Sequence, residues 1–222
     1  QHPEPPLNYQ VVYSLEGVLD YYTTPVLVLE KGAVVEKEAL TEVESVDFPE
    51  PLGRLEAFLT AGGVSRMPYQ YQGRILSMAY KTLRYPGHAH LVKAMRDLGL
   101  FDVEPVLVHG HAVSPREVFI AAVKAHLVKP EGRDLVAMRV IVEGTKGGRP
   151  KTVTYDLLDM YDEALGVTAM MRTTGYSLAA VARLQVEGVI PAGAHTPYEC
   201  VPVEAYVRML AERGIRIERT ER

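Results

Sequence analysis

The 222-residue chain has 47% hydrophobic and 23% charged residues, a balance typical of a globular protein with a sizeable core. Its net charge of −4 and its pI near 6.0 argue against a nucleic-acid partner. No apolar run reaches the roughly 18 residues of a membrane span, so no membrane partner is expected. The single cysteine, Cys200, excludes an internal disulfide framework and favours a reducing, cytoplasmic location.

The first residues read QHPEPP and contain no initiator methionine. This composition is typical of a linker, so we expect residues 1–8 to be extended or disordered. We interpret the chain as a piece of a longer protein or a processed product. Residues 9–222 are then expected to form one domain.

The first half of the chain alternates short helical and strand patterns. Ser14 is placed to cap a helix that continues to Tyr22. The apolar runs on either side of Lys31-Gly32 predict a tight hairpin over residues 26–35. Two further strands are expected at 43–48 and 54–59, followed by a glycine turn at 61–63 and a short irregular or helical piece as far as Gly73.

Residues 80–90 (YKTLRYPGHAH) carry more potential chemistry than any other stretch of this length. An apolar run from Ile75 predicts a strand, Pro86-Gly87 breaks it, and a helical pattern follows. In a regular strand Arg84 lies on one face, and Lys81 and Tyr85 lie on the other. A cationic side chain between a strand end and a helix start is suited to a carboxylate ligand.

The second half continues with a strand at 105–108 and a helix that begins at Ser114-Pro115. Further expected elements are a long hairpin (135–142 with 152–158), helices over 167–187 and 203–213, and a short strand at 215–217. Together these elements predict an α+β (mixed-sheet α/β) fold, with one mixed or largely antiparallel sheet and helices mainly on one face.

The sequence contains neither a dinucleotide-binding glycine fingerprint nor a P-loop, so no cofactor-binding residue is assigned. Two His-x-His pairs, His88/His90 and His109/His111, are compatible with zinc or iron and keep a metal-dependent hydrolase open as an alternative. Because no third ligand completes either pair, we expect no metal.

Arg84 is the strongest candidate binding residue, since a guanidinium matches a carboxylate in a bidentate geometry and Tyr85 is adjacent. The alternative for Arg84 is a structural ion pair with a glutamate. Lys81 is a candidate general base if burial lowers its pKa, and otherwise a solvated strand lysine.

Four stretches resemble the saccharopine dehydrogenase family, especially its lysine 6-dehydrogenase-like branch. They are residues 80–88 (YKTLRYPGH), 8–22 (NYQVVYSLEGVLDYY), 55–65 (LEAFLTAGGVS) and 169–176 (AMMRTTGY). Ser177 stands where the family usually has proline. The stretches span nearly the whole chain in the expected order.

The resemblance implies a substrate-binding and dimerisation domain whose N-terminal Rossmann partner lies outside this chain and binds NAD or NADP. It implies hydride transfer at a C–N bond of lysine, saccharopine or a related amino acid. In that setting Arg84 and Tyr85 hold the substrate carboxylate, Lys81 or His88 moves the proton, and Glu16 contacts the substrate amine.

We expect a homodimer, and we expect the isolated chain to be inactive because nothing in it positions the hydride donor. A non-catalytic amino-acid-sensing or dimerisation module of the same fold is the main alternative.

Overall fold

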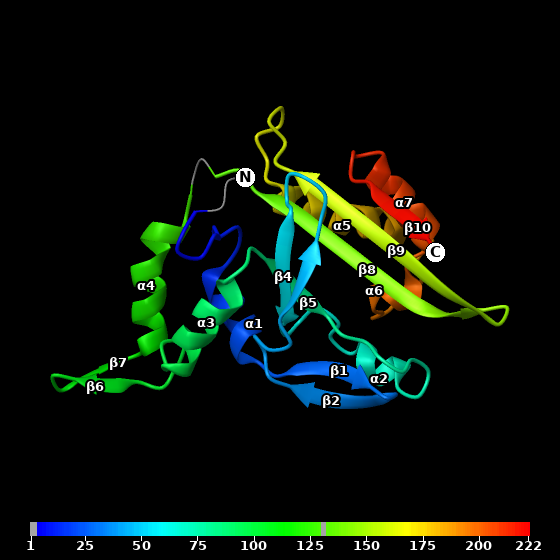
Figure 1. The fold of residues 1–222 in the computed structure, drawn as a ribbon. Helices are drawn as coiled ribbons and strands as arrows, with labels where there is room; N and C mark the ends of the chain where they lie inside the picture. The colour runs from blue at the N-terminus through cyan, green and yellow to red at the C-terminus, as the bar shows by residue number, and fades with distance from the viewer. Residues whose placement is uncertain (1–3, 130–131) are drawn as a thin grey trace. The chain divides into compact units, whose positions relative to one another are not determined.

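The computed structural model describes residues 4–129 and 132–222, which fall into two compact units. We call them the N-terminal unit and the C-terminal unit and describe each by itself (Figure 1). Whether residues 9–222 behave as the single domain expected from the sequence stays a prediction.

The N-terminal unit contains four helices and seven short strands within residues 4–129. In chain order they are α1 (Leu15–Thr23), β1 (Val26–Glu30), β2 (Ala33–Lys37), β3 (Glu44–Asp47), β4 (Arg54–Leu59), α2 (Met67–Tyr71), β5 (Lys81–Arg84), α3 (His88–Asp97), β6 (Val106–Val108), β7 (His111–Val113) and α4 (Pro115–Leu127). They confirm the first predicted helix, the hairpin, the two strands after it and the helix at Ser114.

The strand that leads into the central motif begins later than the sequence predicts. Leu29 and Met78 exchange two backbone hydrogen bonds, of 2.8 and 3.1 Å, at the edge of β1. Only from Lys81 does the chain pair with β4 as a regular strand. The apolar run is therefore divided between two sheets, β1-β2 and β3-β4-β5, and does not form one continuous strand.

Residues 4–8 form a turn and are not extended as the sequence suggests. The Asn8 amide donates to the Glu4 carbonyl at 2.9 Å, and the Leu7 side chain packs against the core. Residues 1–3 of the expected linker lie outside the described residues.

The core of this unit lies between α1, β4 and α3. Ser14 accepts a hydrogen bond from the Gly17 amide and so begins α1, which packs against α3 and α4. The buried members of the core are Leu15, Val18, Leu19, Tyr22, Leu40, Phe58, Ala89, Val92 and Phe101. Burial of these apolar side chains provides the main stabilisation of the unit.

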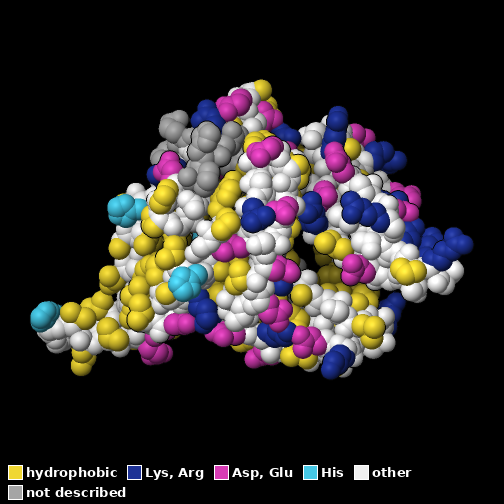
Figure 2. All heavy atoms as spheres, in the orientation of Figure 1, with side chains coloured by type: hydrophobic (Ala, Val, Ile, Leu, Met, Phe, Trp, Pro, Cys, Tyr) yellow, Lys and Arg dark blue, Asp and Glu magenta, His cyan; other side chains and the backbone are white. Residues whose placement is uncertain are grey.

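The predicted strand at 105–108 is present as β6, and a turn at His109-Gly110 leads into a second strand, β7, that the sequence analysis did not predict. Val106, Leu107 and Val108 are all exposed on this hairpin. Figure 2 shows hydrophobic side chains along the hairpin.

The C-terminal unit is a three-stranded antiparallel sheet with helices. Its elements are β8 (Leu135–Lys146), β9 (Arg149–Met160), α5 (Ala169–Val186), α6 (Pro197–Cys200), α7 (Val203–Ala211) and β10 (Ile217–Glu221), with strand order β10-β9-β8. The long hairpin and both predicted helices are confirmed. The hairpin is longer than predicted because pairing continues to the Gly147-Gly148 turn.

Buried polar side chains attach α5 to this sheet. Asp134 accepts hydrogen bonds from the Ala169 and Met170 amides, at 2.6 and 2.9 Å, and so caps the start of α5. Arg172, one turn further on, lies 3.0 Å from an Asp159 oxygen on β9 and 2.5 Å from an Asp162 oxygen. These contacts complement an apolar layer that includes Leu157, Leu210 and Ile215.

The α+β class is confirmed, and the described strand pairs are antiparallel. In place of one sheet, the described residues contain four small sheets, β1-β2, β3-β4-β5, β6-β7 and β10-β9-β8. Each consists of neighbouring strands that pair locally and do not extend into the next sheet. Among the described residues no helix combines the length and the apolar character needed to cross a membrane.

Candidate functional site

The central motif lies at the junction of β5 and α3. Arg84 is the last residue of β5 and is paired in register with Glu56 on β4. Gly87 then has a φ of 96°, a left-handed conformation that glycine adopts without strain, and His88 begins α3. The local sequence therefore places Arg84 and His88 within one tight connection.

The start of α3 is already occupied by a carboxylate. Glu56 is buried, and its two oxygens accept hydrogen bonds from the Gly87 amide at 2.9 Å and the Ala89 amide at 2.6 Å. Negative charge at a helix N-terminus is stabilised by the unpaired amides and the helix dipole. A substrate carboxylate therefore has no vacant position at this helix end.

His88 is a core histidine with only 2% of its surface exposed. Its Nδ1 lies 3.0 Å from the Leu7 carbonyl oxygen and its Nε2 lies 3.1 Å from the Tyr22 hydroxyl, while Phe58 stacks on the ring. A carbonyl only accepts, so Nδ1 carries the proton and Nε2 accepts from Tyr22. Burial, with the nearby positive charge of Arg84, lowers the pKa of His88 to about 4, so it is neutral at pH 7.

Arg84 is surrounded by tyrosines. Its guanidinium lies 4.9 Å from the centre of the Tyr9 ring, and it is hydrogen-bonded to Tyr22. Its Nη1 donates to the Leu83 carbonyl at 2.8 Å. We call Arg84, Tyr9, Tyr13, Tyr22 and His88 the arginine–tyrosine cluster.

Two buried polar atoms of this cluster have no hydrogen-bond partner within the described residues, namely Nε of Arg84 and the hydroxyl of Tyr9. No carboxylate of the described residues lies within 4 Å of the Arg84 guanidinium, which leaves the ion-pair alternative unsupported. Burying a cation without a counter-ion is costly. The arrangement is therefore suited to a small anion.

The neighbouring tyrosines are hydrogen-bond donors at neutral pH. Burial raises the pKa of Tyr13 to about 12, although the charge of Arg84 acts in the opposite direction. Burial likewise raises the pKa of Tyr9 well above its usual range. Both hydroxyls thus keep their protons at neutral pH and are able to donate to an acceptor such as a carboxylate.

Lys81 is not part of this cluster. It lies on the other face of β5, where Nζ donates to the Glu42 carbonyl at 2.8 Å and to a Glu44 carboxylate oxygen at 2.9 Å. These contacts attach β5 to the segment around β3 and give Lys81 a structural ion pair.

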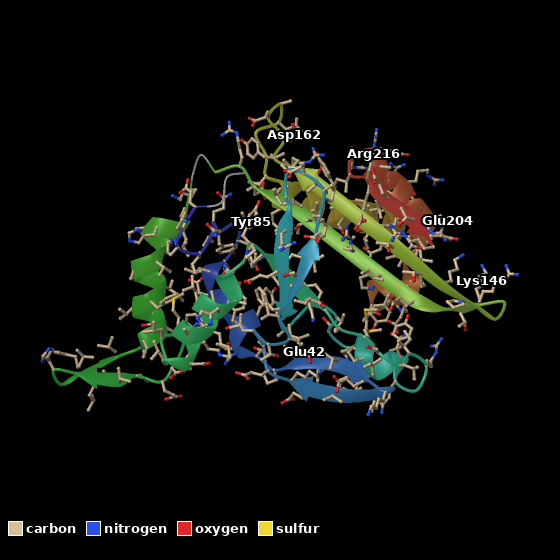
Figure 3. The ribbon with its side chains drawn as sticks, in the orientation of Figure 1. Glu42, Tyr85, Lys146, Asp162, Glu204 and Arg216 are labelled. Carbon is tan, nitrogen blue, oxygen red and sulfur yellow. The ribbon has the colours of Figure 1, made fainter. Side chains whose placement is uncertain are left out.

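Among the described residues, the side chains of Tyr85 and Glu16 form no hydrogen bond, ion pair or ring contact with the cluster, although the Tyr85 carbonyl accepts a hydrogen bond from the His88 amide at 3.4 Å. Tyr85 directly follows β5 (Figure 3) and is half-buried, which raises its pKa. Glu16 is exposed in the first turn of α1, where a bond to its own backbone amide and one from Ser14 hold its pKa below the usual range. The functional roles predicted for Lys81, His88, Arg84, Tyr85 and Glu16 stay predictions.

The sequence analysis missed Tyr9, Tyr22 and Glu56 as neighbours of the motif. Tyr9 and Tyr22 lie within the stretch 8–22 that carries part of the family resemblance, so the signal marked the segment but not the individual residues. In the sequence Glu56 is an ordinary strand glutamate. Only the pairing of β4 with β5 places its carboxylate at the N-terminus of α3.

The described residues contain no group of three or more His, Cys, Asp or Glu side chains suited to holding a metal. His90 is exposed although His88 is buried, and His109 and His111 lie at an exposed hairpin turn. Dinucleotide-binding units of the Rossmann type are built from parallel strands joined by a helix, whereas the described strand pairs of this chain are antiparallel.

The structure thus combines an α+β fold with a partly buried arginine, Arg84, whose Nε has no hydrogen-bond partner among the described residues, and its described strands form no parallel dinucleotide-binding unit. The profile of the family described as "Saccharopine dehydrogenase C-terminal domain" matches residues 1–215, and the chain belongs to this family. The family resemblance is thereby confirmed.

A solved structure, apo histidine-tagged saccharopine dehydrogenase (L-Glu forming) from Saccharomyces cerevisiae, has the same fold. The TM-score is 0.74 at 16% sequence identity, and the match covers 100% of this chain. The chain spans 65% of the length of that yeast enzyme.

Proposed function

We propose that this chain is the substrate-binding domain of a saccharopine dehydrogenase-like oxidoreductase in lysine metabolism. The proposed reaction is oxidation of the C–N bond of lysine, saccharopine or a related amino acid, or the reverse reduction. The proposed redox partner is NAD or NADP, bound mainly by residues outside these two units, so the isolated chain is expected to be inactive. Family membership supports the class of reaction, and the lack of a carboxylate partner for Arg84 among the described residues supports the class of ligand.

Arg84 is the observation that carries this proposal. A partly buried guanidinium with a buried, unused Nε and no carboxylate partner among the described residues is expected to bind an amino-acid carboxylate more strongly than a fully solvated one. Arg84 donates to Tyr22, Tyr22 donates to His88, and His88 donates to the Leu7 carbonyl. This chain of bonds holds the guanidinium in place before the ligand arrives.

The contacts of His88 and Lys81 give less support to a proton-transfer role than the contacts of Arg84 give to carboxylate binding. His88 has both ring nitrogens engaged, so it reaches a substrate only through Tyr22. Lys81 must first leave Glu44 to accept a proton. We propose that His88 acts by positioning Tyr22, that Lys81 is the remaining candidate base, and that Tyr85 and Glu16 contact the substrate carboxylate and amine.

The test uses the full-length enzyme and follows amine-dependent formation of NADH or NADPH with lysine, saccharopine and a panel of amino acids. Hydrogen bonds to a charged group contribute about 1.5–3 kcal/mol, so Arg84→Ala is expected to raise the substrate KM by roughly tens-fold. Arg54→Ala is the control, since Arg54 is an exposed arginine on the adjacent strand β4. A change of KM below about twofold for Arg84→Ala contradicts the carboxylate role.

A non-catalytic amino-acid-sensing module is the second candidate. The sealed position of His88 and the ion pair of Lys81 favour it, because neither proposed proton carrier is free in this structure. Calorimetry separates the two functions. A sensor binds an amino acid through Arg84 without turnover when the cofactor is supplied, whereas an enzyme shows both. In either case we propose a cytoplasmic homodimer.

A further inference from the structure

Three partly exposed tyrosines come together in the N-terminal unit. Tyr13 directly precedes the cap of α1, Tyr21 lies in the last turn of this helix, and Tyr80 directly precedes β5. Their exposed fractions are 37%, 41% and 39%. The ring centres of Tyr13 and Tyr21 are 6.4 Å apart. We call these three residues the tyrosine wall; Tyr13 also belongs to the arginine–tyrosine cluster.

Two consecutive glycines allow the wall to form. A Cβ atom on Gly63 would lie 2.0, 2.2 and 2.3 Å from Cγ, Cδ1 and Cδ2 of Tyr80, so the face of that ring rests on the glycine. A Cβ atom on Gly62 would lie 2.7 Å from the Tyr21 ring. The Ala61 amide donates to the Tyr21 carbonyl at 3.1 Å and attaches this turn to α1. Backbone therefore covers one face of the Tyr80 ring, and its exposed surface lies on the other side.

The alternation of β5 aligns the wall with Arg84. Tyr80, Thr82 and Arg84 follow one another at every second position, which places their side chains on the same face, with about 13 Å between the first and the last Cα. Between them the Thr82 hydroxyl is bonded to the Thr60 hydroxyl at 2.6 Å. Tyr13 interacts electrostatically with both Arg84 and Tyr80 and so links the two ends. Cationic and aromatic surfaces thus lie at opposite ends of one line.

The exposed ring faces are suited to a cation. An aromatic face carries a negative quadrupole that attracts ammonium and guanidinium groups. This unit already contains two such contacts, because Arg84 lies 4.9 Å from the centre of the Tyr9 ring and Arg74 lies 5.5 Å from that of Tyr71. In the described parts of the chain, no arginine or lysine covers a ring of the tyrosine wall in this way. The wall therefore offers ring faces to a cation supplied by a ligand.

We propose that the tyrosine wall binds the ammonium group at the far end of a linear amino acid whose carboxylate binds Arg84. The inference rests on the proposed function and assigns specificity for the distal amine to these three rings. The amine next to the carboxylate is then the one left for Glu16. An amino acid with an apolar or acidic side chain gains nothing from the quadrupole of the rings, so it binds more weakly.

Calorimetry on the full-length protein, with lysine and norleucine as ligands, tests this assignment. Norleucine has the same carbon chain as lysine but no distal amine. Tyr80→Leu removes a ring and keeps an apolar side chain, so it is expected to weaken lysine binding roughly threefold to tenfold and norleucine binding less than twofold. Tyr80→Phe keeps the ring and is expected to change neither affinity by more than about twofold. Tyr69→Leu, at an exposed tyrosine on α2, is the control.

Tyr21→Leu is the second variant, with the same expected effect, and unchanged norleucine binding shows that a variant is folded. Equal weakening of lysine and norleucine would overturn the inference, because it indicates packing without recognition of charge. Weaker NAD or NADP binding at an unchanged ratio of lysine to norleucine affinity would also overturn it, in favour of rings that stack on the cofactor.

Arg84→Ala separates this inference from the proposed function. If Arg84→Ala weakens both ligands while Tyr80→Leu and Tyr21→Leu change neither, the carboxylate role stands and the tyrosine wall is not a binding site. If Arg84→Ala has no effect, or neither ligand binds the wild-type protein, the carboxylate role and the inference built on it are both wrong.

Discussion

Protonation of His88 is expected to destabilise the N-terminal unit below neutral pH. In the unfolded chain a histidine has a pKa near 6.5, whereas burial holds the pKa of His88 at about 4 in the folded protein. Between these two values the unfolded chain binds one more proton than the folded chain. The free energy of unfolding therefore falls as the pH decreases through this window.

The two pKa values set the size of the effect. A histidine shifted from 6.5 to about 4 contributes a loss of about 2 kcal/mol between pH 7 and pH 5, and about 3 kcal/mol by pH 4. Below both values the effect saturates. The physical cause is that imidazolium cannot accept from Tyr22 and would carry a positive charge beside Arg84.

Urea unfolding followed by far-UV circular dichroism at pH 7, 6 and 5 measures this dependence. His88→Gln is expected to unfold more easily at pH 7 by about 1–3 kcal/mol and to lose about 2 kcal/mol of the pH dependence. His90→Gln, an exposed position in the same helix, should keep it. If the wild type and His88→Gln lose equal stability between pH 7 and pH 5, the inference that His88 is buried in its neutral form is wrong.

Three further substitutions test contacts inside one unit or the other. Arg172→Ala leaves Asp159 buried without its partner and should cost about 3 kcal/mol in urea unfolding, whereas a cost below about 1 kcal/mol would show that the pair is effectively solvated. Glu56→Gln retains the size of the cap at α3 but removes its charge, and a loss of about 1–2 kcal/mol is expected, with unchanged thermal unfolding as the contrary result. Gly63→Ala would place a methyl carbon 2.0 Å from the Tyr80 ring, so it should lower the melting temperature, while a neutral outcome would mean that Tyr80 moves aside freely.

Local hydrogen bonding explains which elements the sequence predicts well. Ser14 and Ser114 cap their helices as expected, because a cap joins residues three positions apart. The tight hairpin at Lys31-Gly32 follows from turn residues between apolar runs, for the same reason. The motif connection at Gly87 was also predicted, since glycine readily adopts the left-handed backbone found there.

Contacts between distant residues required the tertiary structure. The sequence selects Arg84 and His88 but does not indicate that Tyr9, 79 residues before His88, packs on both of them. It also does not show that Lys81 reaches Glu44, because that ion pair exists only where β3, β4 and β5 pair in order.

The sequence by itself determined the α+β class and the family, and it singled out residues 80–90 as the candidate site, because these inferences depend on local patterns and short stretches of residues. The tertiary structure decided that the strands separate into four sheets within the described residues, and that Arg84 lacks a carboxylate there. It also showed that the neutral His88 is sealed in the core. Burial and the identity of neighbours arise from packing between segments far apart in the chain, and periodicity along the sequence carries no record of them.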